Sequence, residues 1–365
     1  MKKISVAAVV FVLLNLFSIT ACAYPNESAE SIAEIAGADK LKSEYLSDEE
    51  LSGNKNINVF EKAFQIIIST LTDNGITVIK SFGAILGVVI LSSVMSAMKF
   101  GNSETLDVAC GYISVLALSG VTYSVLYNLF VFVIASMETL TVAMSSLMPI
   151  MASLHIFGGT GATGAAGSAG LTLFFSVLSV ICTKVLLPLL QISFALCLVG
   201  AIPSSVNLSS VTNLVKNTAT TVMAFIFTLL GFTLYLQTAV SSASDTYVTR
   251  SIKFATGVFV PVIGNMLGDA ARTVMASVSI VKGTVGAVGS VIVFSAVLPP
   301  IIAVALHKLL LLGCGIIAKS LGCESESRLL YDLMGILNVL LALVSGAGVI
   351  CIIALAVFIK SGVIM

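Results

Sequence analysis

Ionisable side chains inside long apolar runs are the residues of this chain best suited to do chemistry. Lys184 lies in the middle of one such run, and Asp269 and Arg272 lie three positions apart in another. A charge buried in lipid is costly, so each must be neutralised by a partner or face a polar cavity. Asp269 and Arg272 share one helix face, where they either neutralise each other at an interface or line a conduit. Lys184 is a candidate cavity residue.

The residue sets of known enzyme classes are missing. The two histidines, His155 and His307, have no zinc-binding spacing. Asp269 is the lone acid deep in an apolar stretch, and Met266 stands where an intramembrane aspartyl protease motif needs glycine. No G-x-S-x-G sequence occurs. We therefore predict no catalytic residue, no metal site and no cofactor, and we expect that the protein is not an enzyme.

One glycine motif resembles a nucleotide site. Residues 159–164 fit G-x-G-x-x-G, but an apolar segment precedes them and no acidic residue follows at the required distance. No P-loop lysine is present either. We interpret Gly159 and Gly161 as part of a hinge or close-packed turn between two membrane helices. No nucleic-acid partner is expected.

The composition is that of a membrane protein. Hydrophobic residues make up 58% of the chain and charged residues 10%, and apolar runs of 20 or more residues recur. About 20 apolar residues suffice to cross about 30 Å of hydrocarbon. The seven cysteines form no C-x-x-C pair, so we expect them to act as small buried apolar residues.

The first 75 residues differ from the rest. Lys2 and Lys3, an apolar run and Ala21-Cys22-Ala23 predict a signal peptide over 1–23, cleaved after Ala23, while a lipobox ending at Cys22 stays open as an alternative. Residues 24–75 carry ten acidic and four basic residues and predict an exported acidic arm, either partly helical or a flexible linker. Residues 76–365 form the membrane domain.

The predicted fold is all-α, a polytopic membrane helix bundle of about seven spans, some of them kinked or re-entrant. We expect kinks, hinges or close packing at Pro149, Pro188, Pro261 and Gly264. The pattern Gly83-x-x-x-Gly87 indicates a close helix contact. The apolar segments are 76–98, 108–135, 139–157, 169–202, 218–240, 254–282, 284–312 and 335–359.

Several short sequences occur in a characteristic order. Ser146-Leu-Met-Pro149 is followed by the glycine-rich turn and by Leu187-Pro188, and the second half adds Val260-Pro261-Val-Ile-Gly264, Asp269, Lys282 with spaced glycines, and Pro299. In this order, after a signal peptide and an acidic arm, the chain resembles the stage III sporulation protein AE family of endospore-forming bacteria. The resemblance covers almost the whole chain.

The resemblance implies a role that composition does not show. Such proteins sit in the mother-cell membrane around the forespore, as a platform or permease-like subunit of a secretion-like channel complex needed for late forespore gene expression. The implied partners are other stage III sporulation membrane proteins, a separate ATPase subunit and, indirectly, a forespore membrane protein. The acidic arm would lie outside the cytoplasm. An autonomous secondary transporter for a small solute is the alternative, with Pro149 and Pro261 marking related halves.

Overall fold

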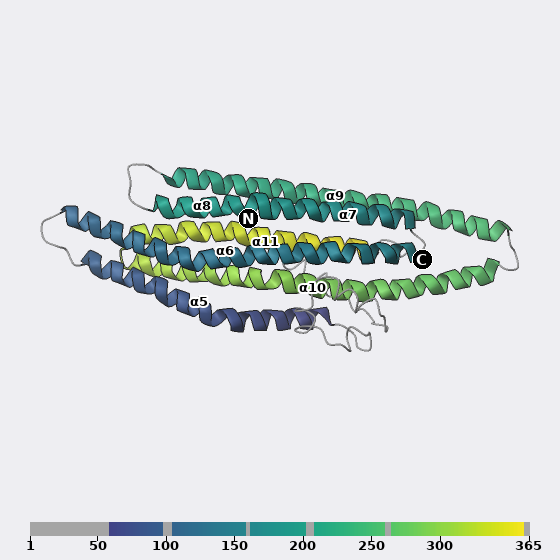
Figure 1. Cartoon of the computed structure of the whole chain (residues 1–365), viewed down its shortest axis with the longest axis horizontal. Coiled ribbons are helices and arrows are strands. Elements are labelled where there is room, and N and C mark those ends of the chain that lie inside the picture. The colour runs from purple at the N-terminus through teal and green to yellow at the C-terminus, as the bar shows by residue number, and fades with distance from the viewer. Residues whose placement is uncertain (1–57, 98–103, 158–160, 202–207, 260–263, 361–365) are drawn as a thin grey trace.

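The computed structural model describes residues 58–97, 104–157, 161–201, 208–259 and 264–360, and this part of the chain is helical apart from Asn58, Ala201 and the turn at residues 321–323 (Figure 1). Buried apolar side chains from all of the helices form one continuous core. The all-α prediction is confirmed. The helices are α5 (Val59–Ala97), α6 (Glu104–Phe157), α7 (Gly161–Val180), the π-helix η1 (Ile181–Leu186), α8 (Leu187–Gly200), α9 (Leu208–Phe259), α10 (Gly264–Ser320) and α11 (Glu324–Lys360).

Helix is the form that these sequences must take in lipid, because only a helix satisfies its backbone hydrogen bonds within a single segment. Serine and threonine hydroxyls add to this by donating to carbonyls one turn back. Thr70 Oγ1 donates to the Ile66 oxygen at 2.7 Å, and Thr122 Oγ1 donates to the Leu118 oxygen at 2.6 Å. Polar side chains thereby stay compatible with an apolar surrounding.

Six of the described helical segments are long and apolar enough to cross a membrane. They are Val59–Ala97, Ala109–Leu154, Ala169–Gly200, Ser210–Leu236, Gly283–Ser320 and Glu324–Val357. The sequence led us to expect about seven. Because six is an even number, six crossings would put the start of α5 and the end of α11 on the same side of the membrane.

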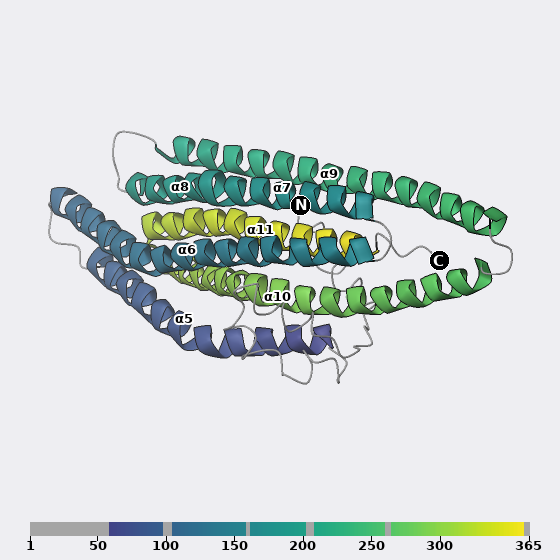
Figure 2. The same cartoon turned by 45° about the vertical axis from the view of Figure 1, so that its right-hand side comes forward.

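The helices lie side by side along one long axis. In both cartoon views α8 and α7 follow one another in a line beside α9, and α10 lies along α11 (Figures 1 and 2). α10 also packs on α5 and α6, so it occupies the centre of the bundle. Its segment Gly283–Ser320 is the most buried of the candidate spans.

Two pairs of segments that the sequence separates are joined in the structure. Segments 108–135 and 139–157 form the single helix α6, which runs through Pro149. Most of 254–282 joins 284–312 in α10, which runs through Pro299 and Pro300. The question that the sequence left open, whether 139–157 and 254–282 cross on their own, is answered in part: each continues a longer helix, without a return turn between the segments of a pair. Proline is tolerated within membrane helices when neighbouring groups satisfy the carbonyl that it leaves free.

The expected irregularity in the 169–202 segment is a π-helix. α7 passes into η1 at Ile181, and the Leu187 N–H donates to the Cys182 oxygen, five residues back. Pro188 follows at once, at the first turn of α8. A proline clashes with the carbonyl four residues before it, which here belongs to Lys184. The wider π-turn relieves that clash, so the chain continues as one bent helix.

Glycines on α11 set its distance from two neighbouring helices. A Cβ atom at Gly346 would clash with the Phe227 ring of α9, and one at Gly348 would lie 2.5 Å from Val297 Cγ1 of α10. These small residues let the helices approach closely where lipid gives no hydrophobic driving force. Gly83 and Gly87 of α5 behave differently, since a Cβ atom on either would meet nothing within 4 Å. They make no close helix contact within the described part of the chain.

Candidate functional site

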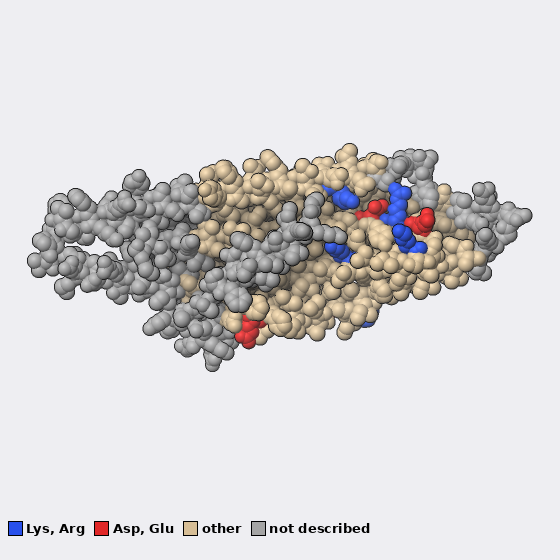
Figure 3. Space-filling model, turned by 180° about the vertical axis from the view of Figure 1, so that it is seen from behind, with Lys and Arg blue, Asp and Glu red and all other residues tan. Residues whose placement is uncertain are grey.

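A group of charged side chains lies between α9 and α11, near the end of the bundle where α10 turns into α11. Asp332 is half-buried on α11, and the positive charges of Arg328, one turn earlier, and of Lys216 from α9 both act on its carboxylate. A Cβ atom at Gly335 would lie 3.1 Å from Lys216 Nζ, so the end of the Lys216 side chain packs against the α11 backbone at Gly335. Figure 3 shows blue and red side chains gathered towards this end of the back face.

This arrangement depends on small residues and on helix spacing. Arg328 and Asp332 are four residues apart and so share one face of α11. Gly335 leaves the space that the Lys216 ammonium occupies, which a larger side chain would fill. Cys197 of α8 is close enough to Asp332 and Lys216 for their charges to act on its thiol. Charged residues from two helices therefore meet in one cluster, which we call the α9–α11 charge cluster: Lys216, Arg328 and Asp332.

A second polar group fixes the turn between α10 and α11. Gly322 has φ +79°, its N–H donates to the Lys319 oxygen at 3.2 Å, and the Cys323 N–H donates to the Ala318 oxygen at 2.9 Å. This is the Schellman hydrogen-bond pattern, which favours glycine at the left-handed position. It satisfies carbonyls that the end of α10 would leave without partners.

Side chains tie this turn to its neighbours. The Ser92 hydroxyl of α5 donates to Glu326 in the first turn of α11, and both residues are buried. Ser327 Oγ donates to the Gly315 oxygen at 3.0 Å. Burial raises the pKa of the Cys323 thiol, and the nearby Glu326 carboxylate raises it further, while hydrogen bonds from Ser92 and Ser93 lower it. The net effect keeps this thiol protonated at neutral pH.

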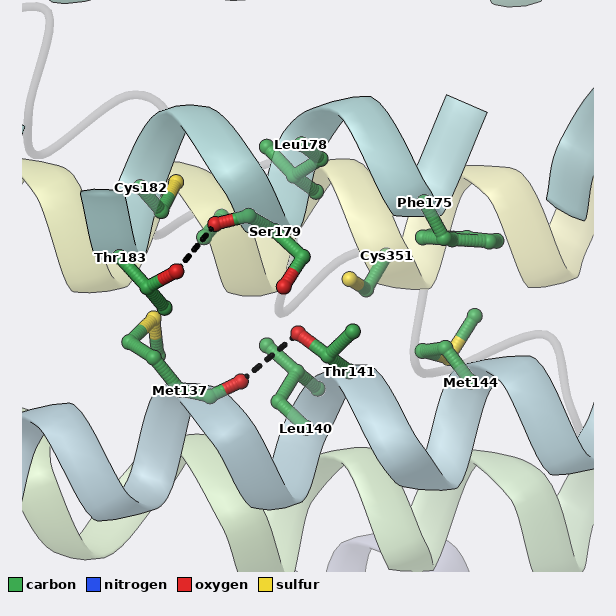
Figure 4. Close-up of a pocket in the computed structure, with 11 residues that line it drawn as sticks. Met137, Leu140, Thr141, Met144, Phe175, Leu178, Ser179, Cys182, Thr183 and Cys351 are labelled. Atoms are coloured by element: carbon green, nitrogen blue, oxygen red, sulfur yellow. Dashed lines mark hydrogen bonds between the residues drawn. The ribbon is translucent and has the colours of Figure 1, made fainter. Parts of the chain in front are cut away.

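A small pocket lies beside the π-helix, between α6, α7, η1 and α11 (Figure 4). It has room for about one water molecule. Thr141 Oγ1 donates to the Met137 oxygen at 2.9 Å, and Thr183 Oγ1 donates to the Ser179 oxygen at 2.8 Å, so both hydroxyls are engaged within their own helices. The lining residues are Met137, Leu140, Thr141, Met144, Phe175, Leu178, Ser179, Cys182, Thr183, Ala347 and Cys351.

The structure separates the three charged residues that the sequence singled out. Lys184 is exposed on η1. Asp269 and Arg272 belong to the first turns of α10, and their side chains lie outside the described part of the chain. Val297 of α10 lies against Gly348 of α11, next to Ala347, and Ala347 lines the same pocket as Thr183, the neighbour of Lys184. Val297 therefore marks the level of Lys184 along the bundle. Asp269 precedes Val297 by 28 residues in α10, which is about 42 Å of helix. The three residues therefore do not form one cluster along the axis.

The predicted hinge positions have different outcomes. Pro149 lies within α6, while Pro188 directly follows the π-helix. Gly161 and Gly264 are the first residues of α7 and α10. Gly159 and Pro261 lie outside the described residues.

Sequence reasoning missed the α9–α11 charge cluster. Its residues lie just outside the apolar segments 218–240 and 335–359, whereas the sequence prediction concerns charges inside apolar segments. One signal was present in the sequence: Glu324, Arg328 and Asp332 alternate in sign at four-residue spacing. No sequence signal placed Lys216 of α9 beside them.

The described residues offer no candidate metal site. No group of three or more His, Cys, Asp or Glu side chains in that part of the chain is placed to hold a metal ion. What the site offers chemically is charge near the end of the bundle and hydrogen bonding at a helix turn. The charges are a means of binding and positioning a partner, whereas the hydrogen bonds at the turn hold the bundle itself together.

Six long apolar helices with charged and polar groups at their ends define a polytopic membrane helix bundle. The chain belongs to the stage III sporulation protein AE family, whose model matches residues 42–362. It is 24% identical over 230 residues to stage III sporulation protein AE of Bacillus subtilis (strain 168), a match that covers 63% of this chain and 57% of that protein. The match thus spans little more than half of that relative. No solved structure matches the chain.

Proposed function

We propose that this protein is a membrane platform or permease-like subunit of a secretion-like channel complex that links mother cell and forespore and is needed for late forespore gene expression. Membership of a sporulation family supports the setting. The six helices able to cross a membrane support the role of a membrane body.

The observation that carries the proposal is the position of the α9–α11 charge cluster. Lys216, Arg328 and Asp332 lie near one end of the bundle, where a soluble or membrane partner can reach them, and the described residues form no candidate metal site beside them. Charged groups at an interface set the choice and register of a partner. The partners that fit are other stage III sporulation membrane proteins and a separate ATPase subunit that supplies energy.

The proposed location is the mother-cell membrane around the forespore, with the acidic arm of residues 24–75 outside the cytoplasm. In that orientation the arm faces the space between the two membranes. Its net charge of −6 suits it to contact basic surfaces there, and so to bind indirectly to a forespore membrane protein.

Deletion of the gene in its native spore former tests the proposal. Engulfed forespores are expected to stall and to lose late gene expression, and the wild-type chain restores both. Asp332→Asn should complement poorly and should fail to co-purify the partner subunits. Glu61→Gln, an exposed charge at the start of α5, is the matched control and should complement fully. Normal spores from the deletion strain would refute the proposal and favour an autonomous secondary transporter.

A further inference from the structure

Three helices of the bundle have long stretches without charge, and their middles lie at one level. These stretches are 217–244 on α9, 283–306 on α10 and 333–359 on α11. The close contacts of Gly346 with Phe227 and of Gly348 with Val297 join them near their midpoints. The contacts therefore mark the level of the bilayer centre, about 15 Å from either edge of the hydrocarbon.

The pocket beside η1 lies at this level. Ala347, which lines it from α11, stands between Gly346 and Gly348 in the sequence. Met137 of α6 and Thr183 of η1 line the same pocket (Figure 4). The residues that follow them, Glu138 and Lys184, are thus within about one helix turn of the bilayer centre.

Both of these charged residues lie on the surface of the chain. Glu138 and Lys184 are exposed, and the exposed stripes to which they belong are otherwise largely apolar. Val131 and Val142 continue the α6 stripe, and Val177 and Val180 lead to Lys184. The stripes are built to face apolar surroundings, but a carboxylate and an ammonium at this depth are costly in contact with lipid. A protein surface, not lipid, must therefore cover this face.

We propose that the face formed by α6 and η1 is covered by the same face of a second copy of this chain. The argument is charge complementarity. Glu138 and Lys184 lie at one level on adjacent helices, so a two-fold axis along the membrane normal brings Glu138 of each copy opposite Lys184 of the other. One isologous contact neutralises all four charges at once, and the valines around them pack in the same interface. This interface stands independently of the sporulation role.

Cysteine crosslinking between two differently tagged, co-expressed full-length chains tests the contact. Glu138→Cys on one chain and Lys184→Cys on the other should form a disulfide-linked pair on oxidation in membranes. Ile79→Cys, another exposed position on the helical bundle, is the control on both chains. Equal crosslinking of the control, or a link that forms only when both cysteines are on one chain, would overturn the proposal.

Charge reversal gives a second measurement. Glu138→Lys alone and Lys184→Glu alone each place like charges opposite each other in the dimer, and self-association should fall at least about tenfold. Mixing the two variants should restore pairing, but only between unlike chains, because each Lys then faces a Glu. Pairing that is weakened in neither variant, or that the mixture fails to restore while both chains remain helical and monodisperse, would refute the two-fold contact.

Discussion

The close approach of Gly348 on α11 to Val297 on α10 makes the Gly348→Ala substitution a direct test of the packing. Gly348 is buried on α11, and the added Cβ would lie 2.5 Å from Val297 Cγ1 and 3.3 Å from Val297 Cβ. A relaxed carbon–carbon contact needs about 3.5–4 Å, so the two helices must separate by about 1 Å. Val297 cannot turn aside, because a β-branched residue in a helix has one strongly preferred rotamer.

The net effect combines two terms of opposite sign. Overpacking a well-packed core costs about 1–3 kcal/mol. Replacing a helical glycine by alanine gains up to about 1 kcal/mol through the lower entropy of the unfolded chain. We expect a net loss of about 1–2 kcal/mol, which lowers the unfolding temperature by roughly 2–8 °C at roughly 2–4 °C per kcal/mol.

Thermal unfolding of the detergent-solubilised protein measures this loss. Unfolding is monitored on a fluorescent fusion by the decrease of its monodisperse peak in size-exclusion chromatography. Gly120→Ala on α6 is the matched control, because a Cβ atom there meets nothing within 4 Å. That control should be neutral or slightly stabilising. If Gly348→Ala is as stable as Gly120→Ala, the helices do not approach as closely as described and the reasoning fails.

Three further predictions concern buried polar groups. Ser193→Ala should stabilise the protein by about 1 kcal/mol in the same assay, because this fully buried hydroxyl has no hydrogen-bond partner. Ser92→Ala should destabilise it by about 1–2 kcal/mol, because the buried Glu326 carboxylate loses its donor. Cys323, with its raised pKa, should react with iodoacetamide more slowly than a free thiol at pH 8, and its rate should rise about tenfold per pH unit, since only the thiolate reacts.

Two of these predictions have a control variant, and the third has an outcome that would contradict it. Ser81→Ala, which loses only an exposed hydroxyl bonded within α5, should be neutral where Ser92→Ala is not. Glu326→Gln should speed alkylation of Cys323, because it removes a negative charge that raises the thiol pKa. A Ser193→Ala protein less stable than the wild type would mean that the hydroxyl has a partner.

Hydropathy was enough to predict the fold class but not the division of the chain into helices. The polar break around Glu138 predicted a boundary between 108–135 and 139–157, yet α6 continues through it. A turn in lipid would leave backbone groups without partners, and continuing the helix avoids this. Packing against neighbouring helices then places the single charge at the surface. Such a choice depends on tertiary contacts, which a residue-by-residue pattern does not contain.

The irregular element was predictable because its cause is local. Pro188 creates a clash with a residue close in sequence, and the π-helix over Ile181–Leu186 is the local solution. The α9–α11 charge cluster was not predictable in the same way. Lys216 and Asp332 are 116 positions apart in the sequence, and Gly335 gives room for the lysine only once the two helices have packed. Contacts of that range follow from the topology of the bundle.

The lengths of α9 and α10 have a mechanical consequence. The helices contain 52 and 57 residues, which corresponds to about 78 and 86 Å. A bilayer with its headgroups is about 40–45 Å thick, so roughly 35 Å of this helical pair must extend beyond it. Figure 1 shows the pair reaching past the ends of α6 and α7. The length of the pair therefore sets the distance between the membrane and any protein that binds at the far end of α9 and α10. Removing two turns from both helices would shorten that distance by about 11 Å.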